Sequence, residues 1–226
     1  MPPTTTTSTT NAPPPTGNFA IEIVVQHDNF ADETSWSLTT ANGATLASQS
    51  ENSGVANGAT VTSTKNVAAG KYTFTINDSY GDGICCGEGT GSFSVKVNGK
   101  LVQSGGDFGS GTAVTFSVGL NQLQSSGVAA NQGQVRQYAM VPPDGASSIS
   151  CSIAGNNGDA DLYASLGRPN DMSESEPTND CVPYENGSNE SCPSSKFGSS
   201  ILGKVLFVSI DAFQTFSGVL LTCTAS

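Results

Sequence analysis

The fold is decided by residues 77–91, which read NDSYGDGICCGEGTG. This stretch contains five glycines, two adjacent cysteines and two aspartates, Asp78 and Asp82, four positions apart. On both sides of it, in 72–77 and 92–97, apolar and polar residues alternate with the period of a half-buried β-strand. The stretch is therefore predicted to be a long, glycine-bent loop on a β scaffold, and such loops commonly carry sites. We predict a calcium-stabilised structural loop here rather than a catalytic one.

The composition indicates an all-β protein. The 226 residues are enough for two small domains, and only 12% of them are charged. Many short alternating runs separated by glycine and asparagine are typical of β structure. The formal net charge of -11 disfavours nucleic acid and anionic membranes as partners. No apolar run approaches ~20 residues, so no membrane span is predicted.

Several features favour an extracellular location. The number of cysteines is even, six, and Asn77, Asn186 and Asn189 each begin an N-x-Ser sequon that accepts glycans in a secretory route. Together with the Thr/Pro-rich start, these features indicate an oxidising compartment. Because no signal peptide is evident, we expect the chain to be a mature or excised piece of a longer secreted protein.

Four segments are predicted along the chain. Residues 1–17 form a Thr/Pro-rich arm: a disordered linker, an O-glycosylated spacer or an arm that docks on a neighbour. Residues 18–118 contain about eight short strand-like runs and a strong hairpin signal at Asn98-Gly99, which predict a first β-sandwich. Residues 119–133 are polar and are predicted to be a linker. Residues 134–226 are predicted to be a second β-sandwich, in which 204–211 is apolar on both faces and should be a central strand.

Asp78 and Asp82 are the main candidate ligands for calcium. The glycines beside them allow tight turns, so that carbonyl oxygens can face inward together with the carboxylates, and these are the ligands that calcium prefers. Asp28, Glu33 and Asp107 are candidates for further ligands, because strands bring distant loops together. The alternative is that the two aspartates form Asx turns without a metal.

A second acidic pattern lies in the C-terminal half. Asn157, Asp159 and Asp161 alternate and would share one face of an extended strand. Turn capping at an exposed edge is the favoured interpretation, and a cation site is the alternative.

The six cysteines allow 15 pairings. Cys151 and Cys223 are both predicted to point into the second core, which favours a bridge between them. Cys181 and Cys192 lie in one polar loop, where a bridge would close a short ring. Cys85 and Cys86 remain, with Cα atoms ~3.8 Å apart, below the usual ~4.4–6.8 Å. A vicinal bridge that stiffens the loop is the favoured interpretation, and a redox switch or an intermolecular bridge is the alternative.

The sequence gives little support for catalysis. His27 is the only histidine, so a site with several histidines is excluded. No Gly-x-Ser-x-Gly elbow is present. Asp78 and Asp82 as a glycosidase pair are disfavoured because they share a loop that looks structural. We therefore predict that the protein is not an enzyme.

Sugar binding is the stronger rival to a purely structural role. Trp36, Tyr80 and Phe108 would present aromatic faces to a sugar beside the calcium loop. However, Leu38 lies on the same strand face as Trp36, so Trp36 is interpreted as a core residue.

Two halves of the chain carry separate motifs. The stretches YAMVP at 138–142, GDADLY at 158–163, NESC at 189–192 and GVLLT at 218–222 cover most of the C-terminal half. In these four stretches, the segment 134–226 resembles the bacterial pre-peptidase C-terminal (PPC) domain. The resemblance implies a small non-catalytic β-sandwich found beside secreted peptidases, and some relatives bind calcium or matrix polymers. The chain departs from that family at 202–208, where LGKVLFV replaces a Gly-x-Trp/Tyr-Tyr-Val strand.

The N-terminal half contains ETSW at 33–36, DSYGDGICC at 78–86, GTGSF at 89–93 and GGDF at 105–108. In these motifs it is similar to an extracellular DSxGDGICC-type module of large secreted proteins of bacteria, diatoms and other algae. This resemblance implies location and modularity, not a reaction.

Two hypotheses of function follow. The first is a non-enzymatic extracellular structural or adhesive building block, stabilised by calcium and disulfides, that self-associates through its arm into a filament or matrix. The second is an accessory region of a secreted hydrolase or peptidase that binds a substrate, such as a glycan or matrix polymer.

Overall fold

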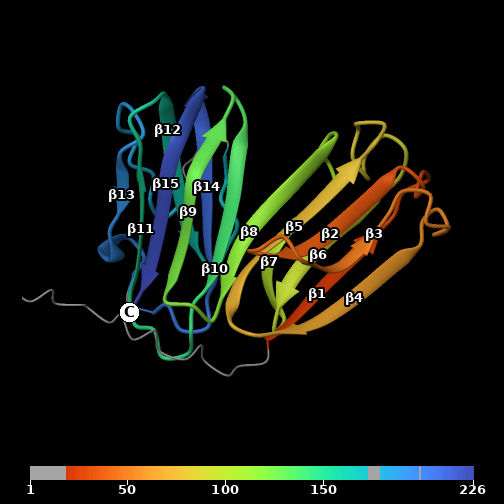
Figure 1. Ribbon diagram of the computed structural model, residues 1–226, viewed down its shortest axis with the longest axis horizontal. Helices are drawn as coiled ribbons and strands as arrows, with labels where there is room; N and C mark the ends of the chain where they lie inside the picture. The colour runs from red at the N-terminus through yellow and green to blue at the C-terminus, as the bar shows by residue number, and fades with distance from the viewer. Residues whose placement is uncertain (1–18, 173–178, 199) are drawn as a thin grey trace, which may run out of the picture.

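The computed structural model describes residues 19–172, 179–198 and 200–226, and the predicted arm at 1–17 lies outside them (Figure 1). The regular secondary structure of the described chain is β-strand, apart from one short 3-10 helix at Ser194–Lys196. None of its helices is long and apolar enough to cross a membrane. The all-β prediction is confirmed. The strands are β1 (Phe19–Gln26), β2 (Thr34–Thr40), β3 (Thr45–Gln49), β4 (Thr60–Val67), β5 (Gly70–Asp78), β6 (Ser92–Val97), β7 (Lys100–Gly105), β8 (Gly111–Val118), β9 (Gln122–Ala130), β10 (Val135–Val141), β11 (Ile149–Ala154), β12 (Asp159–Leu166), β13 (Glu190–Cys192), β14 (Leu206–Gln214) and β15 (Phe216–Ala225).

These strands form three sheets. Two have four strands, in the orders β4-β1-β6-β7 and β13-β11-β15-β9. The third has seven strands, in the order β12-β14-β10-β8-β5-β2-β3. Neighbouring strands are antiparallel except β8 and β10, which are parallel. Figure 1 shows two lobes that meet at these two strands, so one sheet runs through both halves of the molecule.

The N-terminal lobe follows the predicted alternation. Its eight strands, β1 to β8, lie within the predicted first sandwich at 18–118. Ile21, Ile23 and Val25 of β1 are buried, as their period of two predicts. Asn98-Gly99 forms the predicted two-residue turn between β6 and β7, with positive φ at both residues. Positive φ at both central positions is the geometry that favours Asn-Gly in a hairpin.

The two cores lie on opposite faces of the seven-stranded sheet. The N-terminal core includes Ala139 and Phe207 from β10 and β14, although these strands belong to the C-terminal half. The residues next to them, Met140 and Val208, belong to the C-terminal core. β14 is therefore buried on both faces between β12 and β10, which confirms the predicted central strand.

The segment 119–133 is not a linker, contrary to the prediction. Most of it forms β9, which pairs with β15 and buries Leu123, Val128 and Ala130 in the C-terminal core. The alternation is hard to see because the residues at 125–127 are Ser-Ser-Gly and the β9–β15 register shifts there. A shared sheet, rather than a linker, joins the two predicted sandwiches.

Three disulfides are present, with the pairings favoured from the sequence: Cys85–Cys86, Cys151–Cys223 and Cys181–Cys192. The second joins β11 to β15, where the two cysteines lie directly opposite each other. It therefore fastens two neighbouring strands of one sheet within the core.

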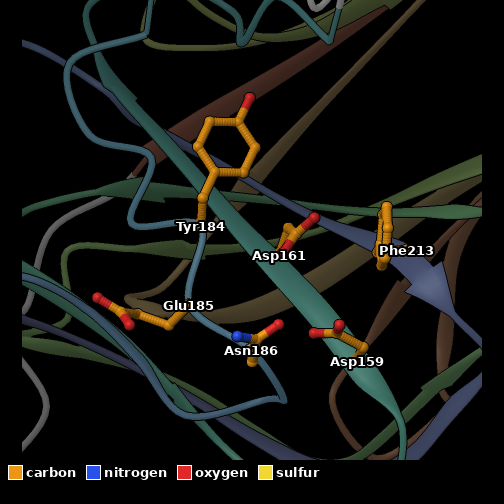
Figure 2. Close-up of a pocket in the computed structure, with 6 residues that line it drawn as sticks. All are labelled: Asp159, Asp161, Tyr184, Glu185, Asn186 and Phe213. Atoms are coloured by element: carbon orange, nitrogen blue, oxygen red, sulfur yellow. The ribbon is translucent and has the colours of Figure 1, made fainter.

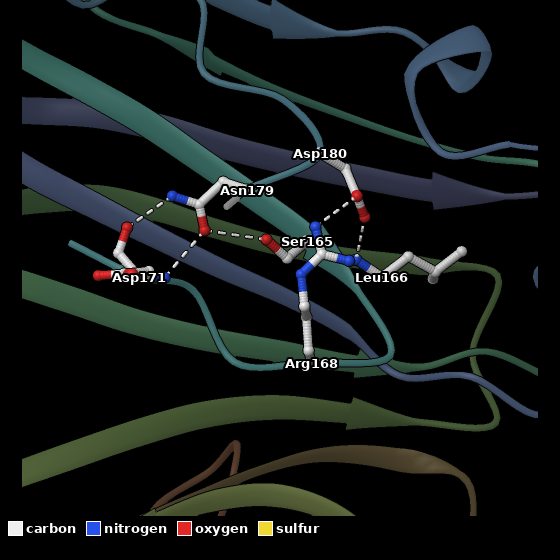
Figure 3. A network of polar contacts seen from close by, with 6 residues as sticks. All are labelled: Ser165, Leu166, Arg168, Asp171, Asn179 and Asp180. Atoms are coloured by element: carbon white, nitrogen blue, oxygen red, sulfur yellow. Dashed lines mark hydrogen bonds and ion pairs between the residues drawn. The ribbon is translucent and has the colours of Figure 1, made fainter. Parts of the chain in front are cut away.

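A polar network covers the outer edge of β12 (Figure 3). The Asp180 carboxylate accepts a hydrogen bond from the backbone of Leu166 at 2.7 Å and forms an ion pair with Arg168 at 2.7 Å. The side chain of Asn179 accepts hydrogen bonds from Ser165 and from the backbone of Asp171. These contacts hold the segment beginning at Asn179 against β12, so this edge of the large sheet is occupied.

Candidate functional site

Strand pairing brings two of the predicted ligands together. Asp78, the last residue of β5, lies opposite Thr34, the first residue of β2. Glu33 immediately precedes Thr34, and its carbonyl oxygen accepts a hydrogen bond from the backbone of Ser79 at 3.0 Å. Asp82 reaches the same place from the glycine-rich loop. One carboxylate oxygen from each of Glu33, Asp78 and Asp82 lies within 4.8 Å of the others.

Close backbone packing shapes the loop. Ile84 is fully buried, and its amide donates to the carbonyl oxygen of Gly106 at 2.8 Å. Gly83 has φ +82°, and a Cβ there would lie 2.6 Å from the same oxygen. A Cβ at Gly91 would lie 2.1 Å from the carbonyl oxygen of Ile84. Glycine is needed at these two positions because no side chain fits between the backbones.

The cluster concentrates negative charge. The pKa of Glu33 is raised, first by partial desolvation and then by repulsion from nearby carboxylates. These carboxylates belong to Asp78, Asp32, Asp82 and Asp28. A cation bound between these groups would relieve the repulsion.

Two further observations concern how the site fits a metal. The Asp78 carboxylate accepts a hydrogen bond from the backbone of Gly81, three residues on, at 2.7 Å, which is one residue beyond the Asx turn considered as the alternative. Thr34 is fully buried, and its hydroxyl oxygen has no hydrogen-bond partner among the described residues. As register partners, Thr34 and Asp78 project from the same face of the sheet. An unsatisfied buried oxygen beside three carboxylates fits the oxygen-only preference of calcium.

The structure does not bring the other two predicted ligands, Asp28 and Asp107, into this cluster. The carboxylate of Asp28 accepts a hydrogen bond from the backbone of Phe30 at 2.9 Å, and a Cβ at Gly89 would lie 2.9 Å from the Asp28 Cβ. Asp28 therefore shapes its own turn beneath the loop. Asp107 contributes backbone next to Gly83 instead of a carboxylate to the cluster.

A small pocket of about 190 Å³ opens beside the cluster, lined by Phe30, Glu33, Tyr80, Asp82 and Glu88. Tyr80 is 78% exposed and Phe30 is 42% exposed. Phe30 was not predicted from the sequence, although an apolar residue in the polar turn that follows β1 was a signal for it.

The other predicted aromatic residues are buried or partly buried. Trp36 is buried, as interpreted from the sequence, and its indole N–H donates to Gln49. Phe108 packs edge-on against Phe93, with ring centroids 5.8 Å apart. Tyr80 is thus the member of the predicted set that faces solvent.

His27 is part of the core. It is 1% exposed, and its Nε2 lies 3.1 Å from the side-chain nitrogen of Gln49. Burial lowers the pKa of His27 and keeps the ring neutral near neutral pH. The position is therefore structural.

The three sequons occupy different surroundings. Asn77 and Asn186 are exposed, on β5 and in the loop before β13. Asn189 is also exposed, but both polar atoms of its amide bond to the backbone of Gly155. Glycosylation at these positions stays a prediction.

The chain has few similarities to known proteins. No family model matches it, and no curated protein matches it. A solution structure described as "vEP C-ter 100" is 32% identical and covers 43% of this chain and 88% of its own, with a TM-score of 0.35. The CUB1-EGF-CUB2 domain of human MASP-1/3 is 9% identical, covering 92% of this chain and 89% of its own, with a TM-score of 0.27. The STIV MCP is 9% identical, covering 93% and 89%, with a TM-score of 0.27. These likenesses assign no family.

Proposed function

We propose that the protein is a non-enzymatic, extracellular structural building block that is stabilised by calcium and disulfides and joins to further copies through its N-terminal arm. The observation that carries the proposal is an open sheet edge on the N-terminal lobe. Three disulfides support an oxidising location. The resemblance of 134–226 to the PPC domain supports the same location.

The shared sheet suits a building block because it joins the lobes through backbone hydrogen bonds. Side chains add to this joint. The side chain of Gln103 on β7 donates to that of Gln137 on β10, and the Lys71 ammonium on β5 donates to the carbonyl oxygen of Gln124 on β9 at 2.9 Å. A unit joined in this way would transmit force between neighbours without bending between its lobes.

β4 offers the most regular open edge among the described strands. It pairs with β1 over eight consecutive residues without a register shift, and no described strand pairs with its other side. The other edges are less suitable. β3, β7 and β9 have register shifts, β13 is three residues long, and the segment beginning at Asn179 covers β12. An open, regular edge is a template for an added strand.

The arm has a sequence that fits this edge. Residues 4–11 read TTTTSTTN, eight residues without proline and rich in threonine, which favours strands. Prolines at 2–3 and 13–15 bound the stretch, and proline cannot donate to a sheet ladder.

The test compares the full chain with a chain lacking 1–17 and with Thr7→Pro and Thr7→Val. Analytical ultracentrifugation should find assemblies of the full chain and of Thr7→Val, which keeps strand propensity. Thr7→Pro and the shortened chain should be monomers, because one lacks a backbone donor and the other lacks the strand. Equal assembly of the shortened chain would refute the role of the arm.

Calcium binding by Glu33, Asp78 and Asp82 is the second part of the proposal. The calcium would supply the positive charge that holds the loop against β2 and β5. Titration calorimetry with calcium chloride should show binding that Asp82→Asn weakens about tenfold or more, since one ligand loses its charge. Asp144→Asn, which removes one exposed charge from the other lobe, is the matched control. No calcium-dependent heat, or equal losses in both variants, would contradict this assignment.

Glycan binding is the second candidate function, and the exposed rings of Phe30 and Tyr80 beside the carboxylates favour it. Aromatic rings and carboxylates suit the apolar faces and hydroxyl groups of sugars. In a screen of neutral oligosaccharides, calcium-dependent binding that Tyr80→Ala abolishes would support this candidate. No binding across the screen would leave the structural role alone.

A further inference from the structure

The C-terminal lobe has a larger pocket, of about 440 Å³, at the start of β12 (Figure 2). It also involves the loop before β13 and the end of β14. The residues that line it are Asp159, Asp161, Tyr184, Glu185, Asn186 and Phe213. We propose that this pocket binds an arginine side chain of a basic segment in a partner protein.

Two exposed aromatic rings are the first support. Tyr184 is 54% exposed and Phe213 is 57% exposed, which is unusual for side chains of this size in a folded domain. In the view of Figure 2, Asp161 lies between them. Aromatic faces attract cations, and a guanidinium also stacks on them.

Tyr184 is held in place before any ligand arrives. The buried Tyr163 packs edge-on against it, with ring centroids 5.8 Å apart and planes at 87°. The hydroxyl group of Tyr163 donates to that of Tyr184 at 3.3 Å. A ring fixed in this way loses little conformational entropy on binding.

Negative charge is the second support. Asp159, Asp161 and Glu185 line the pocket, and no lysine or arginine is among the lining residues. Asp211 on β14 lies directly opposite Asp161, and like charges in such cross-strand pairs repel. A ligand with positive charge would lower this repulsion.

The loop that carries half of the pocket is fastened to β12. Asp159 accepts a hydrogen bond from the backbone of Gly187 at 2.9 Å. The buried carboxylate of Glu190 accepts hydrogen bonds from the backbones of Leu162 and Glu185. Burial, with repulsion from Asp161 and Asp159, raises the pKa of Glu190 to about 7. The pocket is therefore preformed.

Geometry favours an organic cation over a metal ion. Among the described residues, only Glu33, Asp78 and Asp82 bring three carboxylate oxygens close enough to share an ion. The carboxylates of the C-terminal pocket do not converge in this way, and a guanidinium, whose five donors point outward in one plane, does not need them to. A guanidinium uses the negative charge as well as the aromatic faces, whereas a neutral sugar would use these carboxylates only as hydrogen-bond acceptors.

The test uses acetyl-Gly-Arg-Gly-amide as the probe and acetyl-Gly-Gln-Gly-amide as its uncharged control, followed by NMR chemical shifts of the whole chain. The arginine peptide should shift the backbone signals of Tyr184 and Phe213, and the glutamine peptide should not. Phe213→Ala should weaken binding about fivefold or more, because it removes a ring and leaves the net charge unchanged. Its side chain is exposed, so the variant should fold.

Asp161→Asn should also weaken binding. Glu51→Gln, which removes one exposed charge from the other lobe, is the matched control and should leave binding unchanged. Shifts confined to other surfaces, equal affinity in Phe213→Ala, or equal weakening by Glu51→Gln would overturn the proposal. Stronger binding of calcium chloride or of a neutral oligosaccharide at this pocket would also overturn it.

Discussion

Removing the disulfides one pair at a time should lower stability in an order set by the chain length that each one closes. Each bridge is replaced by a pair of alanines, giving Cys151→Ala/Cys223→Ala, Cys181→Ala/Cys192→Ala and Cys85→Ala/Cys86→Ala. The sequence separations are 72, 11 and 1. A bridge over a longer loop restricts the unfolded chain more, so its loss should cost more.

The loop-closure relation gives the magnitudes. A separation of 72 corresponds to about 4.4 kcal/mol at room temperature, and a separation of 11 corresponds to about 2.8 kcal/mol. The adjacent pair closes no loop, so its entropic contribution is about zero. All four cysteines of the two longer bridges are at most 5% exposed, so the packing loss is similar and the difference of about 1.6 kcal/mol remains.

The assay is denaturant unfolding without reductant, followed by far-UV circular dichroism and by the fluorescence of Trp36, the only tryptophan. The denaturant concentration at the unfolding midpoint should fall most when the cysteines at 151 and 223 are replaced. It should fall least when those at 85 and 86 are replaced. A larger loss for the pair at 181 and 192, or a loss at the adjacent pair equal to either, would refute the reasoning.

Three further predictions follow from single positions. Phe207→Ala should destabilise the protein by about 3–5 kcal/mol. Because Phe207 packs into the N-terminal core, the unfolding transition followed by Trp36 fluorescence should shift as well. An unchanged fluorescence transition would contradict the shared sheet. The pKa of Glu190 is raised, so between about pH 4.5 and 7 the native state keeps a proton that the unfolded state has lost. The stability of the wild-type protein relative to Glu190→Gln should therefore fall by about 2–3 kcal/mol from about pH 5 to about pH 8. A stability difference that stays constant with pH in denaturant unfolding would disprove this. Gly83→Ala should lower the free energy of unfolding by about 2–4 kcal/mol in thermal unfolding, because φ is +82° and the new Cβ would lie 2.6 Å from a carbonyl oxygen. Gly87→Ala is the control and should be nearly neutral, because there is open space around Gly87.

Much of the fold could be predicted from local pattern. Alternation fixed which residues of β1 and β5 face the core, and Asn98-Gly99 fixed one hairpin, because both depend on neighbours along the chain. The sharing of a sheet depends on the parallel pairing of β8 with β10, which is not encoded locally. The apolar run at 138–141 was a signal for it, since such runs indicate strands buried on both faces.

The candidate site was predicted in part for the same reason. Asp78 and Asp82 share a loop, so their proximity follows from sequence. Glu33 joins them only because Thr34 pairs with Asp78, and the register of that pair could not be predicted. The same limit explains why Asp28 and Asp107 were included.

The C-terminal pocket was not predicted as a whole. Asp159 and Asp161 were noticed as a pattern, but their aromatic partners, Tyr184 and Phe213, come from a loop and from another strand. Only tertiary structure brings these segments together.

The most direct test of the proposed function is negative-stain electron microscopy of the full, calcium-loaded chain beside the chain that lacks 1–17. The proposal predicts regular assemblies of the full chain and isolated two-lobed particles of the shortened one. Isolated particles of both chains across the concentration range would contradict the proposal that this protein is an assembling structural subunit.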